Sequence, residues 1–278
     1  MIALLPVCGG FRILCTPALF HVHIPMTATS ISASTPAPQP ALSEAQRILN
    51  TFFAPSKTFA DLKRKPSWWV PWLLISIVSL LFMYAVTQKI GGEQLAQNYL
   101  RNNPKMAERL EKAPPEQQER QMRMMATSFK YFGYAVPVFT LVIWLIIAGV
   151  IMATMNFGAG AEIPFRTSMA VVAYSWLPFL VHGLLALVIL FAGVAPDAFN
   201  LENPVATNLG FLIGDPASSP GLYRLASSID IFSIWVVILM GLGFATLSKL
   251  TRSTATIIVA AWWLLVVLVR AGWAAAFS

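Results

Sequence analysis

The 278-residue chain contains 57% hydrophobic and only 11% charged residues, and its mean hydropathy is +0.67. A soluble domain usually has about 45 to 50% apolar and about 25% charged residues, so this composition excludes an ordinary soluble enzyme and indicates an integral membrane protein. The net charge of +7 then reflects basic flanks that face anionic lipid, and we expect no nucleic-acid partner.

Residues 1–41 predict no folded domain. Prolines interrupt the first 25 residues, which fits a secretory signal poorly, and residues 27–41 have the Thr, Ser, Ala and Pro content of a disordered segment. We expect a disordered lead, with Met26 as an alternative translation start. Cys8 and Cys15 lack partners at metal-ligand spacing, so neither a disulfide framework nor a metal site is expected.

Residues 42–53 predict an amphipathic helix at the membrane surface. Ser43 and Gln46 have the spacing of a capping box, and an apolar face of helical period follows. That face comprises Leu42, Ala45, Ile48, Leu49, Phe52 and Phe53. A surface helix with one apolar face lies in the plane of the lipid headgroups, and Pro55 ends this one.

A basic and aromatic segment follows, of the kind that anchors a span at the interface. It comprises Lys63, Arg64, Lys65, Trp68, Trp69 and Trp72. Because loops rich in Lys and Arg stay in the cytoplasm, this segment predicts a cytoplasmic N-terminus, and an odd number of spans then leaves the C-terminus outside. One observation disagrees: residues 89–130 hold eight Lys or Arg residues and would be external.

Five apolar runs are each long enough to cross a bilayer. A hydrocarbon core of about 30 Å takes roughly 20 helical residues, and an open strand in lipid would leave backbone groups unpaired. The runs are residues 69–88, 131–156, 168–194, 229–248 and 254–275. We therefore expect an all-α membrane protein, in which residues 42–278 form a five-span helical bundle with amphipathic helices at the N-terminus and in the first loop.

The first loop, residues 89–130, predicts two amphipathic helices joined at Pro114 and Pro115. Its alternating charges are typical of a solvated face. The later loop, residues 195–227, is rich in Pro, Gly and Asn and has a single basic residue, Arg224. We expect an irregular external loop there.

The third run contains the most suggestive polar residues. Tyr174, Pro178 and His182 follow at four-residue steps and so share one helical face, with Ser175 beside them. Ionisable groups inside a span are functional candidates because exposure to lipid is costly. His182 is either a neutral imidazole bonded to a neighbouring helix or part of a proton relay or ligand contact, and Pro178 should kink the helix.

The remaining candidates are weaker. Arg270 near the end of the fifth run either snorkels to the interface or pairs with a polar helix face. Gly241 and Ala245 have the four-residue spacing that permits close helix packing. We find no catalytic motif and no pair of carboxylates within the spans, so neither an enzyme nor a cofactor is expected.

Three short stretches resemble a known family. They are Phe53-Ala54-Pro55-Ser56-Lys57-Thr58-Phe59, Lys65-Pro66-Ser67-Trp68-Trp69-Val70-Pro71, and Ala173-Tyr174-Ser175-Trp176-Leu177-Pro178. The chain is similar to the bacterial branch of the Ypt-interacting protein (YIP) family. The resemblance implies a non-enzymatic, multi-pass protein, in the inner membrane if bacterial, and a helix-packing role for Tyr174, Ser175 and Pro178.

Eukaryotic YIP relatives associate with Rab-type small GTPases and with one another. The longer acidic and aromatic N-terminal region of those relatives has no counterpart here, so we do not expect small-GTPase binding. The leading hypothesis is a scaffold that organises the membrane, binds partner membrane proteins or self-associates. The alternative is a small transporter or channel with a polar path along Tyr174, Ser175 and His182.

Overall fold

The structure, a computed structural model, describes residues 41–213 and 216–277. The expected N-terminal lead therefore lies outside the described residues, together with Met26, Cys8, Cys15 and Ser278. Within the described ranges the regular secondary structure is helical, apart from an isolated β-bridge between Asn208 and Asp230. This confirms the predicted all-α fold.

Five apolar segments build the bundle. They are α3 (Trp69–Lys89), α7 (Val136–Ala153) with the π-helix η1 (Thr154–Gly158), α8 (Phe165–Ser175) with α9 (Pro178–Phe191), α11 (Ile231–Leu247) and α12 (Arg252–Phe277). Four of them are long and apolar enough to span a bilayer, and α11, with 17 residues, is shorter. The multi-pass membrane architecture follows from these helices.

The loop between the first two spans differs from the prediction. It forms three helices, α4 (Gly92–Arg101), α5 (Pro104–Glu111) and α6 (Pro115–Tyr134), where the sequence predicted two. The additional break occurs because Pro104 has no N–H to continue α4 and instead starts a new helix. Residues 131–134, which we assigned to the second span, belong to α6, and Pro137 places the start of α7 at Val136.

The third span is interrupted at its centre. Pro178 cannot donate a backbone hydrogen bond, so α8 ends at Ser175 and α9 begins at Pro178. The connecting turn is tightened by a hydrogen bond from the Phe179 N–H to the Trp176 carbonyl, at 3.0 Å. The predicted kink at Pro178 is therefore a break between two helices.

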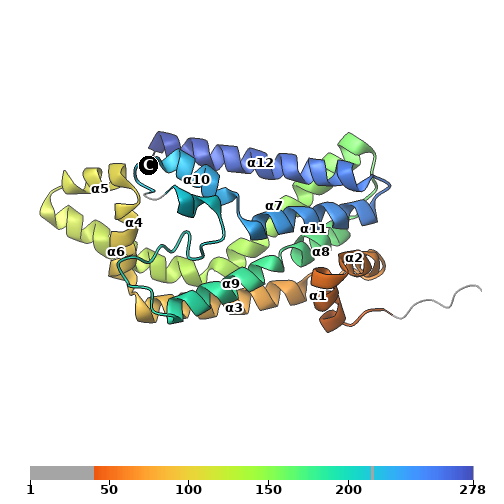
Figure 1. Cartoon of the computed structure of the whole chain (residues 1–278), viewed down its shortest axis with the longest axis horizontal. Coiled ribbons are helices and arrows are strands. Elements are labelled where there is room, and N and C mark those ends of the chain that lie inside the picture. Colours follow the sequence, from red (N-terminus) through yellow and green to blue (C-terminus); the bar gives the residue numbers. More distant parts are fainter. Residues whose placement is uncertain (1–40, 214–215, 278) are drawn as a thin grey trace, which may run out of the picture. The chain divides into compact units, whose positions relative to one another are not determined.

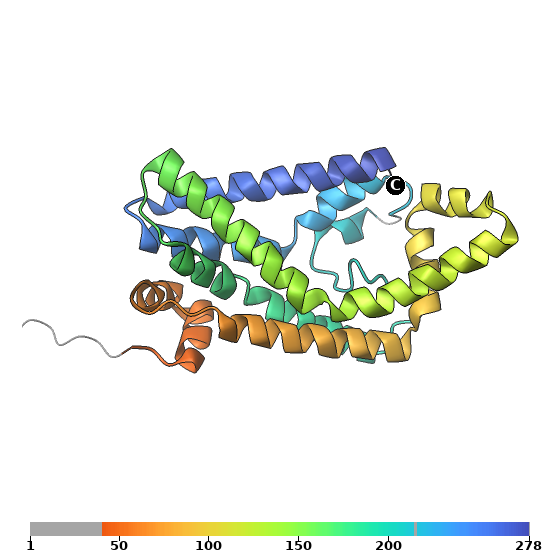
Figure 2. The ribbon, with the colours of Figure 1, turned by 180° about the vertical axis from the view of Figure 1, so that it is seen from behind.

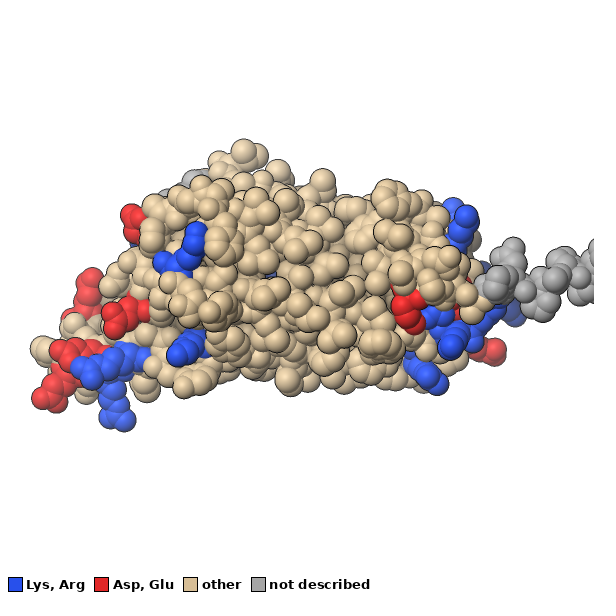
Figure 3. Space-filling view, turned by 90° about the horizontal axis from the view of Figure 1, so that it is seen from below, with Lys and Arg blue, Asp and Glu red and all other residues tan. Residues whose placement is uncertain are grey.

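The bundle has two distinct ends (Figures 1 and 2). At one lie α1 (Glu44–Phe53), α2 (Pro55–Arg64) and the turns before α8 and α12; we call it the α1–α2 end. At the other lie α4, α5, α10 (Pro220–Ser228) and the C-terminal part of α12; we call it the α4–α6 end. Figure 3 shows charged side chains toward both ends of one face and a largely uncharged band between them, as expected for a bilayer-spanning protein.

Packing differs between the two ends. The larger buried cluster combines α2, α7, α8 and α11 and includes Phe59, Trp144, Tyr174 and Phe244, all fully buried. A smaller cluster at the α4–α6 end centres on Val86, Leu95 and other side chains of α3, α4 and α9. Large apolar side chains remain exposed between the ends, as lipid-facing positions require.

Candidate functional site

A network of ionic and hydrogen-bonding side chains joins α1, α2 and α8 at the α1–α2 end. We call it the polar clamp, and it comprises Glu44, Arg47, Asp61, Arg64 and Tyr174. The Arg47 guanidinium lies 2.6 Å from the Asp61 carboxylate, and these residues are 1% and 2% exposed. Arg64 contacts the second Asp61 oxygen at 2.8 Å, and Arg47 reaches Glu44 at 3.0 Å. The Tyr174 hydroxyl donates to the other Glu44 oxygen.

The buried groups of the clamp are hydrogen-bonded. Asp61 also accepts the backbone N–H of Leu42 at 3.3 Å, and Arg47 donates to the carbonyl of Lys65 at 3.2 Å. The Thr51 and Thr58 hydroxyls both donate to the carbonyl of Arg47, at 2.8 and 2.9 Å. A satisfied buried network of this kind specifies one arrangement of the helices that contribute to it.

The clamp also fixes its own charge state. Burial alone would raise the pKa of the Asp61 carboxyl, but the hydrogen bond from Arg47, the Leu42 N–H, the charge of Arg47 and the bond from Arg64 together hold it below its ordinary value. Burial would likewise lower the pKa of Arg47, yet the bond to Asp61 and the nearby carboxylates raise it. Both groups are therefore ionised at neutral pH.

The clamp determines which side of α1 faces the bundle. The buried residues of α1 are polar, Arg47 and Thr51, while Ile48 and Phe52 pack at the edge of the large cluster. Leu49 and Phe53 remain 60% and 85% exposed. The apolar face predicted from the sequence is thus divided between the bundle and an outward surface. Arg47 and Asp61 were not predicted from the sequence. The available signal was an oppositely charged residue three positions from each, Glu44 for Arg47 and Arg64 for Asp61.

The predicted polar face of the third span is separated by the helix break. Tyr174 belongs to the polar clamp, and the buried Ser175 hydroxyl has no protein partner. His182 lies on α9, where its ring contacts Phe179 and Phe232 at centroid distances of 6.1 and 5.3 Å. The structure therefore gives Tyr174 and His182 different neighbours.

His182 instead lines a cavity of about 780 Å³, which we call the bundle cavity. Its walls come from α3, α6, α7 and α9, and its outer rim from α4, α5 and residues 201–204. Most of the lining side chains are apolar. The cavity reaches inward to Ile75 and Trp176, both of which contact the large buried cluster.

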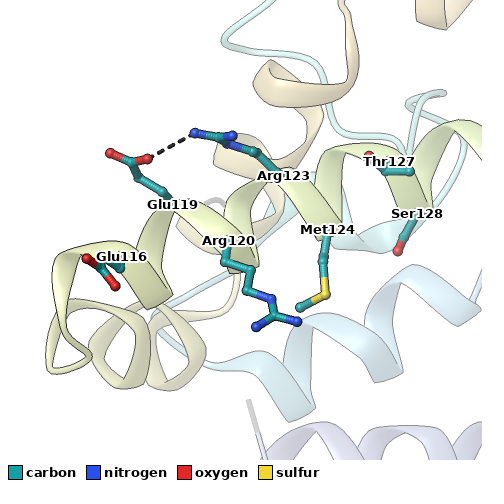
Figure 4. Close-up of a pocket in the computed structure, with 7 residues that line it drawn as sticks. All are labelled: Glu116, Glu119, Arg120, Arg123, Met124, Thr127 and Ser128. Atoms are coloured by element: carbon teal, nitrogen blue, oxygen red, sulfur yellow. Dashed lines mark hydrogen bonds and ion pairs between the residues drawn. The ribbon is translucent and has the colours of Figure 1, made fainter.

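A second, shallower groove follows the exposed side of α6 (Figure 4). Glu119 and Arg123 form an ion pair at 3.0 Å and are 71% and 78% exposed. Arg120 and Met124 project from the opposite side of the helix (Figure 4). Because all its lining residues belong to one exposed helix, the groove has none of the convergent walls of a binding site.

The residues predicted to anchor the first span have mixed surroundings. Trp68 and Trp72 pack edge to face at 6.4 Å, and Trp72 donates to the carbonyl of Pro137 at 3.0 Å. Trp69 is 55% exposed, and Lys63 and Lys65 are exposed as well. Of these six residues, Arg64, Trp68 and Trp72 therefore have side-chain contacts within the protein. The side chains of Lys63, Lys65 and Trp69 are exposed, although the Lys65 carbonyl accepts a hydrogen bond from Arg47.

The small residues of the fourth span lie at helix contacts. A Cβ atom at Gly241 would lie 2.7 Å from the Cα of Thr256, so this glycine permits the close approach of α11 and α12. Ala245 packs at the edge of the large cluster. Arg270 is exposed on α12. Among the described residues, no three His, Cys, Asp or Glu side chains are grouped as a metal site requires.

A comparison with known protein families matches residues 49–273 to the Yip1 domain. This chain belongs to the Yip1 family. The family resemblance found in the sequence is thereby confirmed. No curated protein and no solved structure matches the chain.

The Yip1 domain contains most of the features described above. The matched region begins within α1 and ends within α12, so it includes the bundle cavity and three clamp residues, Asp61, Arg64 and Tyr174. Glu44 and Arg47 lie just before its first residue. The first turns of α1 therefore complete an ionic network whose other members belong to the Yip1 domain.

Proposed function

We propose that this Yip1-family protein is a non-enzymatic scaffold that binds partner membrane proteins through α1. The observation that supports this proposal is the polar clamp, which fixes α1 on the bundle while leaving Leu49 and Phe53 exposed. A helix held to the membrane by its apolar face alone needs no buried ion pair. Desolvating two charges is expensive, and such a pair is better suited to fixing one orientation of a binding surface.

The charge distribution supports a cytoplasmic location for this surface. Residues 41–68, 159–167 and 248–253 surround the α1–α2 end and carry eight Lys or Arg against three Asp or Glu. Residues 89–134 and 192–230 at the other end carry nine of each. Basic residues near the ends of spans mark the cytoplasmic side, and acidic residues have little influence. The totals of Lys and Arg at the two ends are nearly equal, so the orientation rests on the cluster Lys63, Arg64 and Lys65 directly before α3. We therefore place the N-terminus inside and the C-terminus outside.

Cysteine labelling tests this orientation in a variant without Cys8 and Cys15. Thr251→Cys lies in an exposed turn at the α1–α2 end, and Gln117→Cys lies on exposed α6. In intact cells, an impermeant maleimide should label position 117 and spare position 251. The reverse pattern would invert the proposed orientation.

Photocrosslinking tests the binding surface. A photoreactive amino acid at Leu49 or Phe53 should form adducts with a defined membrane protein or with a second copy of this chain. The same amino acid at Leu81, which is 53% exposed on the apolar helix α3, should give lipid adducts and serves as the control. Lipid adducts alone at all three positions would contradict partner binding.

The alternative function is transport, which the position of His182 in the bundle cavity favours. Reconstituted liposomes distinguish the two proposals. A scaffold should show no proton or ion flux above that of protein-free liposomes, and His182→Ala should leave crosslinking at Phe53 unchanged. A current that wild-type protein carries and His182→Ala abolishes would establish a transporter.

A further inference from the structure

We propose that the bundle cavity binds one acyl chain of a zwitterionic phospholipid, taken from the leaflet at the α4–α6 end. Three of the helices that wall the cavity, α3, α7 and α9, are predominantly apolar and belong to membrane spans, and the fourth, α6, contributes Met125, Phe129 and Phe132. The part of the cavity between α3, α7 and α9 therefore lies at the depth of the hydrocarbon core, where the molecules at highest concentration are lipid chains. Its volume of about 780 Å³ is within the range of roughly 300 to 1,000 Å³ typical of small-molecule sites.

The chemistry of the walls fits a flexible alkyl chain. Phe82, Phe129 and Phe179 provide apolar surface, and Met83 and Met125 add unbranched side chains that adapt to an irregular ligand. An alkyl chain seated there would make dispersion contacts with the side chains around it. Most of the lining side chains are apolar and suit a lipid chain.

The rim of the cavity differs from its interior. Tyr99 and Glu202 line it near the α4–α6 end, and Glu202 pairs with Arg224 at 2.5 Å. A carboxylate beside a guanidinium presents both signs of charge, which matches the amine and phosphate of a zwitterionic headgroup. At the inner end, the Trp176 ring lines the cavity.

The dimensions of the cavity disfavour a helix from a partner protein. A helix with side chains is about 10 Å wide, so a space of this volume would accommodate only about 10 Å of its length, or roughly two turns. A single alkyl chain is much narrower and can extend from the rim to Trp176. The cavity therefore fits one lipid chain better than a polypeptide segment.

The experiment uses the full chain in nanodiscs that contain a phosphatidylcholine with a photoactivatable diazirine in one acyl chain. After illumination, mass spectrometry maps the adducts. We expect them to concentrate on the cavity residues Met83, Met125 and Phe129, and to exceed those on Leu268, an α12 residue that is 53% exposed. Equal labelling of the cavity residues and Leu268 would identify ordinary annular lipid and overturn the proposal.

Cavity-filling variants provide the second readout. Thr140→Phe places a ring in the cavity and displaces two or three methylene groups of the chain, so labelling of Met83 and Met125 should fall roughly 15- to 60-fold. Val138→Phe is the matched control, because Val138 is on the same helix and 63% exposed; it should label like wild type. Ser79→Phe fills the cavity from α3 and replaces Thr140→Phe if that variant does not fold. Undiminished labelling in a folded cavity-filling variant would also overturn the proposal.

Discussion

Replacing Arg47 with Met should release α1 from the bundle. Asp61 is 2% exposed while α1 is docked. In the docked variant its Oδ1 would keep the bonds to Arg64 and to the N–H of Leu42, while Oδ2 would lose both of its contacts with Arg47. Breaking a buried ion pair by removing one partner costs about 3 to 5 kcal/mol. Because Arg64 still compensates part of the Asp61 charge, we expect the lower limit of about 3 kcal/mol.

Hydrogen exchange of the α1 amides measures this loss directly. If these amides exchange through local opening of α1 and α2, a loss of about 3 kcal/mol accelerates their exchange roughly 100-fold. The matched control is Lys63→Met, which removes an exposed cation from α2 and should change exchange less than threefold, or about 0.6 kcal/mol. Equal exchange rates of the α1 amides in Arg47→Met and in wild type would refute the structural role of the clamp.

A double variant separates the buried charge from the lost contacts. In Arg47→Met with Asp61→Leu, no uncompensated carboxylate remains in the interior. Replacing both members of a buried pair with apolar residues is often neutral or stabilising, so the double variant should exchange more slowly than Arg47→Met. An additive loss in the double variant would show that packing, and not the orphaned charge, dominates.

Three further predictions concern single positions. Tyr174→Phe removes the hydrogen bond to the half-exposed Glu44 and should destabilise α1 docking by about 1.5 kcal/mol, seen as faster α1 exchange. The pKa of the Asp61 carboxyl is lowered in the folded state. The stabilisation that ionised Asp61 provides is therefore present above its ordinary pKa of about 3.9 and is lost only as the pH falls through the lowered value. We expect α1 to stay docked at about pH 4 and to loosen below it. Gly241→Ala places a Cβ atom 2.7 Å from the Cα of Thr256 and should cost about 1 to 3 kcal/mol, measured as a lower unfolding temperature in detergent.

Each of these predictions has a control. Tyr84→Phe alters an exposed tyrosine of α3 and should leave α1 exchange unchanged. Asp61→Asn should abolish the acid transition, once exchange rates are corrected for their intrinsic pH dependence; a transition that persists would assign it to another group. Gly272→Ala adds a Cβ atom with no neighbour within 4 Å, and a stability loss as large as that of Gly241→Ala would contradict the close contact of α11 and α12.

The sequence alone determined the membrane character and the number of apolar segments. Both depend on local composition: an apolar run of sufficient length must be helical in lipid, because no water is available for its backbone groups. The capping box at Ser43 and Gln46 was likewise predicted from residues three apart, and both of its hydrogen bonds form. The family resemblance also rested on short contiguous stretches, and the match to residues 49–273 confirmed it.

The helix breaks were only partly predictable. Pro178 indicated a kink but not the end of a helix, since a proline in a span can be accommodated by local bending when neighbouring groups satisfy the freed carbonyls. The extra break before α5 was missed, although Pro104 is the residue responsible.

The candidate sites depended on tertiary structure. Arg47 and Asp61 are 14 residues apart on different helices, and Tyr174 lies more than a hundred residues further along, so no local periodicity could show that they meet. The helical period placed Tyr174 and His182 on one face, but that inference required an unbroken helix. The bundle cavity is lined by six helices and residues 201–204, and such a space exists only once their packing is fixed. Local composition thus determined which segments enter the membrane, whereas the contacts between segments decided which polar groups are buried together and where the bundle stays open.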